Sequence, residues 1–207
     1  MFFLFALFLA DFERYVKVDG EENLTKGEIY YISPFHFYLN VKEPLRQVFF
    51  ERGDTLIIYY PLHKRAFKFH LLNPFSLPLL AEVKSVNIAL LRLGMRILRK
   101  ETNGERNRFI WTSSAGEYVE IEEEKGHIVY FKYLHKKMGL KTEINFSKFI
   151  KIENSWIPTE ITATGSGRGK RVRQKWLFYN VRTDIAIPDS IKNFKIPQGI
   201  PVEVGEL

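Results

Sequence analysis

The stretch GEIYYISPFHFYLNVKEPLRQVFFERGDTLIIYYP, from Gly27 to Pro61, decides the fold of this 207-residue chain. Its side chains alternate with the period of two that is typical of β-strands. In its central strand, one side carries Phe35, Phe37, Leu39 and Val41, and the other carries His36, Tyr38 and Asn40. A soluble antiparallel sheet usually needs only one apolar face, yet both faces are rich in large apolar groups here. The stretch therefore raises the question of what covers the second face.

The same alternation continues on both sides of this stretch, and short connections between the segments favour antiparallel hairpins. Asn103-Gly104 is a strong hairpin signal, and Arg52-Gly53-Asp54 is typical of a turn between two strands. No shift in composition marks a domain boundary. The pattern predicts one domain over residues 1–207, mainly β with helices (α+β), built on one strongly curved antiparallel sheet with helices against one face. The expected strands are 11–18, 25–32, 35–41, 45–52, 55–60, 64–70, 96–101, 107–112, 117–123, 127–135, 141–152, 156–164 and 171–184.

Two segments are expected to be helical. Residues 73–93 carry leucines spaced by three and four, although Pro78 must interrupt or restart the helix. Residues 1–10, MFFLFALFLA, are too short to span a bilayer, which takes about 20 residues. We expect a short buried helix there and a soluble folded product, and the sequence leaves open whether the segment is the remnant of a longer export signal.

The sequence offers no constellation for catalysis. The chain has no cysteine, which excludes thiol chemistry, and its five histidines lack metal-binding spacing. No serine lies in a GxSxG turn, and Gly165-Ser166-Gly167-Arg168-Gly169-Lys170 lacks the Ser or Thr of a phosphate loop. We therefore expect a binding protein with no enzymatic activity, no metal and no cofactor.

The net charge of +7 favours acidic partners in general. A basic run from Arg168 to Lys175 stands beside Trp176, Phe178 and Tyr179, a combination that suits stacking of single-stranded nucleic acid. These aromatic residues, however, alternate as residues of a sheet do, and the same charges suit an anionic membrane surface. The expectation is that the chain does not bind nucleic acid.

The opening stretch resembles the first half of the periplasmic outer-membrane lipoprotein carriers, the LolA-like family. The shared features are a glycine-led strand, a proline, an aromatic strand, a second proline, and an aromatic strand that ends in proline. The segment Phe194-Lys195-Ile196-Pro197-Gln198-Gly199-Ile200-Pro201-Val202 is similar to the closing segment of the family. One position departs from the pattern, since Ser33 stands where well-studied carriers have an arginine that helps to hold a lid closed.

This resemblance implies an unclosed half-barrel whose concave side is covered by a helical lid, with an apolar cavity for acyl chains between the two. It implies a non-catalytic exported carrier, periplasmic or otherwise, whose partners are acyl chains of lipoproteins or lipids and membrane-associated delivering and receiving proteins. A second reading is a sensor or regulatory domain of the same fold that binds a mislocalised lipoprotein or a polypeptide. The expected cavity residues are Phe35, Phe37, Leu39, Val41, Val48, Phe50, Ile58 and Tyr60, and the expected lid residues are Phe5, Phe8, Leu79, Leu80 and Val83.

Overall fold

The structure is a computed structural model that describes residues 7–33, 36–70, 86–87, 90–91, 94–152, 155–167, 169–183 and 185–206. The expected residues Phe5, Phe35, Leu79, Leu80 and Val83 lie outside this described part. Its elements are β1 (Phe8–Val18), β2 (Glu21–Ser33), β3 (His36–Glu43), β4 (Gln47–Arg52), β5 (Thr55–Tyr60), β6 (Arg65–His70), β7 (Arg96–Asn103), β8 (Arg106–Thr112), β9 (Glu117–Glu124), β10 (His127–His135), η1 (Lys136–Met138), β11 (Leu140–Ile152), β12 (Ser155–Gly167), β13 (Lys170–Arg182), α2 (Asp189–Lys192) and β14 (Val202–Glu206).

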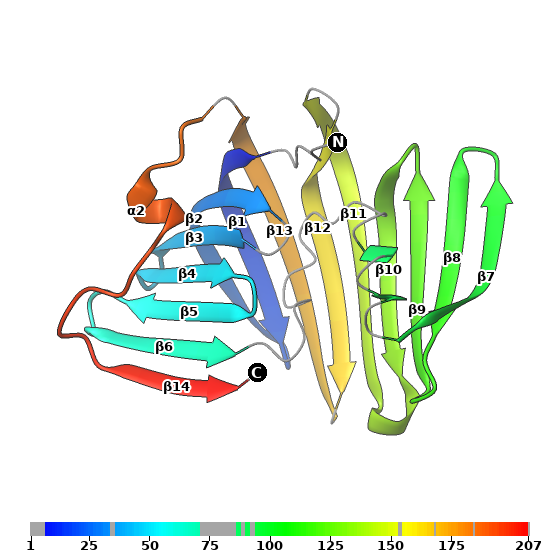
Figure 1. Cartoon of the computed structure of the whole chain (residues 1–207), viewed down its shortest axis with the longest axis horizontal. Helices are drawn as coiled ribbons and strands as arrows, with labels where there is room; N and C mark the ends of the chain where they lie inside the picture. The colour runs from blue at the N-terminus through cyan, green and yellow to red at the C-terminus, as the bar shows by residue number, and fades with distance from the viewer. Residues whose placement is uncertain are drawn as a thin grey trace.

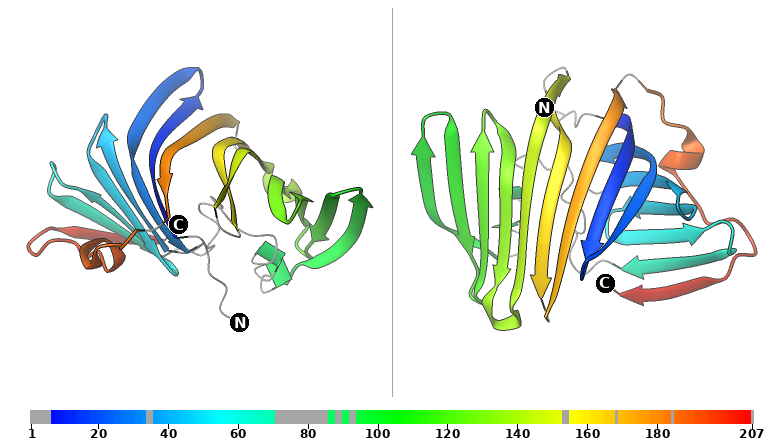
Figure 2. Two further views of the ribbon diagram at one scale, coloured as in Figure 1. Left: turned by 90° about the horizontal axis from the view of Figure 1, so that it is seen from above. Right: turned by 180° about the vertical axis from the view of Figure 1, so that it is seen from behind.

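All the described strands belong to one 14-stranded sheet, in the order β14-β6-β5-β4-β3-β2-β1-β13-β12-β11-β10-β9-β8-β7. The pairing of β1 with β13 joins two arms, a first arm from β14 to β1 and a second arm from β13 to β7. Figure 1 shows the arms side by side, and Figure 2 shows the sheet from above as an arch. The edge strands β14 and β7 are not paired with each other, so the sheet is an unclosed, strongly curved half-barrel.

Neighbouring strands of the described sheet are consecutive in the chain, as in hairpins, except in the pairs β1–β13 and β14–β6. Neighbouring strands are antiparallel throughout the described sheet except at β14, which runs parallel to β6 with Val202 opposite Ala66. The predicted boundaries of β5 and β10 agree with the structure, and most other strands are longer than predicted by a few residues. The sequence pattern did not predict β14.

One face of the sheet, named the inner face below, carries the core across both arms. Phe12 of β1 lies opposite Phe178 of β13, and Trp176 lies opposite Ile161 of β12. In the second arm, Ile121 of β9 continues the row. These side chains belong to one buried cluster that reaches from β3 to β8. Burial of this apolar surface is the main force that holds the arch together.

The expected N-terminal helix is wrong for the residues that can be compared. Phe8, Leu9 and Ala10 are the first residues of β1, and Phe8 pairs with Tyr31 of β2. Phe8 is therefore part of the sheet rather than of a lid. All three side chains are buried, so the polar alternation that marks a strand is missing from the sequence here.

The expected central helix is described only in part, and a helical lid is not supported by the described residues. Residues 86–87 and 90–91 have helical conformation, within the predicted segment 73–93, whereas 71–85 lie outside the described part. The other helical elements of the described chain are the short η1 and α2. No helix within the described ranges has the length and apolarity needed to cross a bilayer.

Candidate functional site

The inner face of the first arm holds five of the predicted cavity residues. Phe37, Leu39 and Val41 alternate along β3, and each is at most 4% exposed. Leu39 lies opposite Phe49 of β4, and Phe49 lies opposite Ile58 of β5, so Ile58 and, by alternation, Tyr60 share this face. Ile58 and Tyr60 are only partly buried. The structure thus brings these residues into one row that runs across three strands.

The register places Val48 and Phe50 on the opposite, outer face. Val48 lies opposite Asn40, and Phe50 lies opposite Tyr38. Both side chains are buried although they do not belong to the inner cluster. These two residues therefore do not line the same surface as Phe37 and Leu39.

The cover of this outer face comes from the C-terminal segment, residues 188–194, which includes α2. The ring of Phe194 lies 5.6 Å from that of Tyr38, 5.7 Å from that of Phe50 and 6.3 Å from that of Tyr59. His36 donates from Nε2 to the carbonyl oxygen of Lys192 at 3.0 Å. The second apolar face of the opening stretch is thus covered by the protein itself (Figure 1).

The second arm contributes inner-face residues that the sequence analysis did not name. They are Phe109 and Trp111 of β8, Val119 and Ile121 of β9, and Ile144 and Phe146 of β11, all buried in the common cluster. The signal that could have found them is the same period of two, which is clearest in β9, where Val119 and Ile121 flank Glu120. Without the strand order, the pattern does not show that they share a surface with Leu39.

The helical residues Val86 and Leu90 contribute to the same cluster. Val86 is 3% exposed and Leu90 is 2% exposed, and both are grouped with the inner-face residues of the two arms. Leu91, on the neighbouring position, is 60% exposed. The spacing of Val86 and Leu90 by four residues places them on one side of a helical turn, which is the side that contacts the core.

The outer face of the second arm is polar and internally paired. A hollow of about 780 Å³ is lined by residues of β8–β11 such as Arg108, Glu120 and Tyr130. Arg108 pairs with the buried Glu120, which also accepts a hydrogen bond from the hydroxyl of Tyr118 at 3.0 Å. Arg106 pairs with Glu124 at 2.8 Å. Each of these carboxylates has a cationic or hydroxyl partner, so the ladder stabilises the arm.

Tyrosine hydroxyls donate to carboxylates on both faces of the second arm, Tyr130 on the outer face and Tyr133, which lies opposite Val119, on the inner face. Burial raises the pKa of Tyr130, and a hydrogen bond donated to Glu143 at 3.0 Å adds to the rise. Burial and a hydrogen bond donated to Glu117 raise the pKa of Tyr133 to about 12. Both hydroxyls therefore stay protonated at neutral pH and act as donors. Within the described ranges, no three His, Asp or Glu side chains gather in a way that could hold a metal ion.

No family model and no curated protein sequence matches the chain. Solved structures do match its fold. A LolA superfamily protein from Nitrosomonas europaea is 14% identical and covers 92% of this chain and 91% of its own, with a TM-score of 0.60. A putative outer membrane lipoprotein-sorting protein domain from Vibrio parahaemolyticus is 12% identical, with 88% and 87% covered and a TM-score of 0.62.

A DUF1329 family protein from Desulfovibrio piger is 14% identical, covers 91% of this chain and 90% of its own, and has a TM-score of 0.59. At such low identity the likeness concerns the backbone, and it extends over nearly the whole of both chains in each comparison. The arch of β1–β14 is thus similar in backbone fold to these proteins. The chain has a LolA-like fold.

Proposed function

We propose that the protein is a non-catalytic carrier that shelters acyl chains of lipoproteins or lipids against its inner face. The single observation that carries the proposal is the buried apolar cluster of this face, which extends from Phe37, Leu39 and Val41 in the first arm to Trp111 in the second. Phe37, Leu39, Val41, Ile58 and Tyr60 form the first-arm part of the binding surface. The LolA-like fold supports the proposal, since a structural neighbour is named for lipoprotein sorting.

In this proposal, the acyl chain replaces the apolar residues of the protein that cover the inner face. Phe37 is 1% exposed in this structure, so an acyl chain reaches it only when the residues that cover it move away. Burying a chain of roughly 14 carbons gains around 11 kcal/mol at about 0.8 kcal/mol per CH₂ before any cost. Displacing Val86 and Leu90 from the core offsets part of that gain, which allows the cargo to be released.

The proposed setting is the periplasm or another exported location, with membrane-associated proteins that deliver and receive the cargo. The lid residues Phe5, Leu79, Leu80 and Val83 belong to this proposal as the parts of the cover that precede Val86 in the chain. Ser33, at the end of β2, stands where a latch arginine is found in the carriers that the sequence resembles. We infer that the cover here is held by apolar contacts rather than by that latch.

The three tryptophans provide a direct test. Trp111 and Trp176 are buried in the inner cluster, whereas Trp156 is 39% exposed and stacks on His127 at 5.4 Å. Brominated fatty acid should quench the fluorescence of the Trp156→Phe variant, which keeps both inner reporters. The matched Trp111→Phe/Trp176→Phe variant, which keeps only Trp156, should be quenched little.

Native mass spectrometry of protein purified without detergent should detect bound acyl species. Circular dichroism on each tryptophan variant controls for folding. Equal quenching of the two variants, or no quenching of either, together with a protein free of acyl mass, would contradict the proposal.

A further inference from the structure

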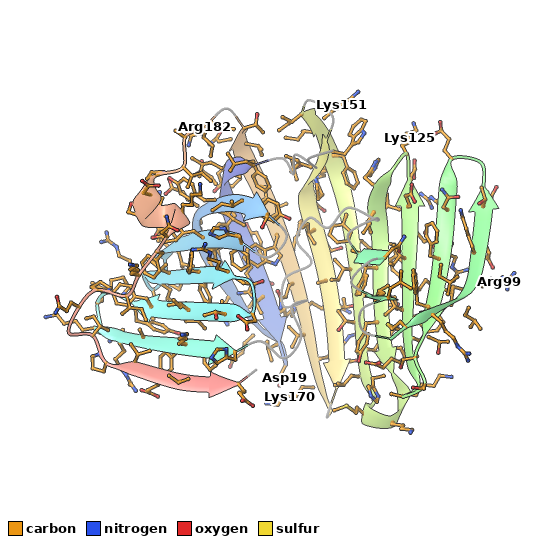
Figure 3. All side chains as sticks on the ribbon, in the orientation of Figure 1. Asp19, Arg99, Lys125, Lys151, Lys170 and Arg182 are labelled. Carbon is orange, nitrogen blue, oxygen red and sulfur yellow. The ribbon has the colours of Figure 1, made fainter. Side chains whose placement is uncertain are left out.

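The inner face changes character along the strands β1, β2 and β13. Towards the start of β1 it carries Phe8, Ala10 and Phe12, opposite Tyr31, Ile29 and Gly27 of β2. Towards the end of β1 it carries Arg14, Val16 and Val18, opposite Thr25, Asn23 and Glu21. Figure 3 shows Asp19 and Lys170 at this second end of the sheet, at the tips of neighbouring hairpins, and Arg182 at the opposite end. The apolar surface therefore becomes polar towards the Asp19 end.

Arg14 stands at the boundary between these two parts. Its guanidinium lies over the ring of Trp176, 4.9 Å from the ring centre, and Nη2 donates to Oε1 of Gln174 at 3.1 Å. Trp176 in turn lies 5.4 Å from Phe12, within the core. The charge is thus held at a fixed place on the inner face, next to the last fully apolar row.

The guanidinium keeps unused donor capacity. Nε is buried and has no acceptor, and no carboxylate pairs with Arg14 among the described residues. Burial lowers the pKa of Arg14, yet an arginine remains charged at neutral pH. A partly buried cation without an anionic partner is costly, and a planar guanidinium matches the oxygens of a carboxylate or phosphate.

We propose that Arg14 receives the anionic oxygen headgroup, a carboxylate or a phosphate, of an amphiphile whose apolar tail lies along the inner face towards Phe12 and Ile29. This inference rests on the proposed function and adds the ligand class and the direction in which the ligand lies. Thr25 and Gln174, which flank Arg14 on the same face, supply further polar contacts for the headgroup. The headgroup then faces the Asp19 end of the arch.

Three probes with the same tail and different headgroups distinguish the contribution of the headgroup to the affinity from that of the tail. Calorimetric titration should show dodecanoate or dodecyl phosphate binding roughly tenfold to a hundredfold more tightly than uncharged dodecanol, the range expected for charge-assisted hydrogen bonds. The tighter of the two anions identifies the source of the headgroup. Equal affinity for all three probes would overturn the role of Arg14 and leave the carrier function standing. Failure of all three to bind would contradict the carrier function itself.

Substitutions at Arg14 test whether the preference for anionic probes depends on this residue. Arg14→Gln should weaken the binding of dodecanoate and dodecyl phosphate far more than that of dodecanol, so that the preference for anions is lost, whereas Arg14→Lys should keep part of the preference, since it retains the charge without the planar fork. Arg173→Gln is the matched control, because Arg173 lies on the same strand pair, opposite Lys17, and is exposed. A preference that survives in Arg14→Gln, or disappears in Arg173→Gln, would contradict the proposal.

Discussion

Gly27 shows how tightly the inner face is packed at the level of one residue. It lies in β2 between Phe12 of β1 and Val41 of β3. A Cβ atom at this position would overlap the carbonyl oxygen of Asn40 and come within 2.9 Å of Cε1 of Phe12. Backbone cannot yield as a flexible side chain can, so the absence of a side chain is required here.

Replacing Gly27 with alanine should therefore lower the free energy of unfolding by at least about 2 kcal/mol, since overpacking in a close-packed core typically costs that much. Chemical denaturation measures the change. Gly165→Ala in β12 is the matched control, because nothing lies within 4 Å of a Cβ built there. The control should have the stability of the wild type or slightly more. Similar losses in both variants would show that strand glycines matter for another reason.

The sequence predicted which residues of a strand share a face, but it did not show which face of the strand lies inside the arch. The period of two correctly grouped Phe37, Leu39 and Val41. It could not assign Val48 and Phe50, because β4 is apolar on both sides and the register alone decides which side faces the core. On the outer face, Phe50 is covered by Phe194, a residue that is far away in the sequence.

At the scale of elements, a histidine contributes to the attachment of the C-terminal segment to β3, beside the ring contact of Phe194 with Tyr38. His36 donates to the carbonyl oxygen of Lys192, and its ring lies 5.5 Å from that of Phe50. Burial lowers the pKa of His36, against a smaller opposing effect of the hydrogen bond to Lys192, and the nearby cations Arg52 and Lys192 lower it further. The folded state therefore favours the neutral ring.

The sign of the pH dependence follows from this shift. The unfolded chain binds a proton to His36 more readily than the folded chain, so the contribution of the neutral ring is present above about pH 6.5 and is lost as the pH falls through the lower folded pKa. We expect the stability of the wild type to fall from pH 7 to pH 5, and that of His36→Phe to fall less. Denaturation at the two pH values tests this.

His127→Phe serves as a comparison for this experiment. Burial also lowers the pKa of His127, which lies in the second arm against Phe149 at 4.2 Å. Its replacement should reduce the acid sensitivity separately, and the double variant should show the sum of the two effects because the sites share no partner. An unchanged pH dependence in His36→Phe would show that its protonation does not weaken the attachment.

Elements were predictable where turn residues mark their ends. The turn at Gly53-Asp54 precedes β5, and the turn at Lys125-Gly126 precedes β10. The start of β1 was mistaken for a helix because Phe8, Leu9 and Ala10 are all buried. The missed β14 is short, its valines are exposed, and its partner β6 is distant in sequence, so no local pattern marks it.

At the scale of the whole molecule, the carrier proposal makes stability and cargo affinity oppose each other. Val86 and Leu90 pack into the inner cluster, which the cargo is proposed to occupy. The Val86→Ala/Leu90→Ala variant should lower the free energy of unfolding by about 2–5 kcal/mol and bind dodecanoate more tightly than the wild type. Denaturation and calorimetry measure the two quantities on the same preparation.

Leu91→Ala controls for the loss of a leucine from the same helical turn, since Leu91 is 60% exposed. It should leave both quantities close to the wild-type values. If the double variant loses stability and binds dodecanoate no better, Val86 and Leu90 are ordinary core residues and do not compete with a ligand.

The sequence predicted the general architecture of the sheet, but it did not establish which residues cover the inner face. Alternation and turn signals predicted one curved sheet, and its unclosed form agrees with the resemblance of Gly27 to Pro61 to known carriers. The order of strands across the two arms depends on the contact of β1 with β13, which no local pattern encodes. The helical spacing of residues 73–93 could be compared with the structure only at residues 86–87 and 90–91.

The pairing of β1 with β13 has a consequence for biosynthesis. A ribosome produces β1 at the beginning of the chain and β13 close to its end, so β1 has an open edge until the final strands emerge. The aromatic rings of Tyr38, Phe50 and Tyr59 remain bare for longer still, because Phe194 follows β13. Unpaired strand edges and exposed aromatic rings favour aggregation, so we expect β1 and the rings of Tyr38, Phe50 and Tyr59 to be the aggregation-prone parts of an incomplete chain.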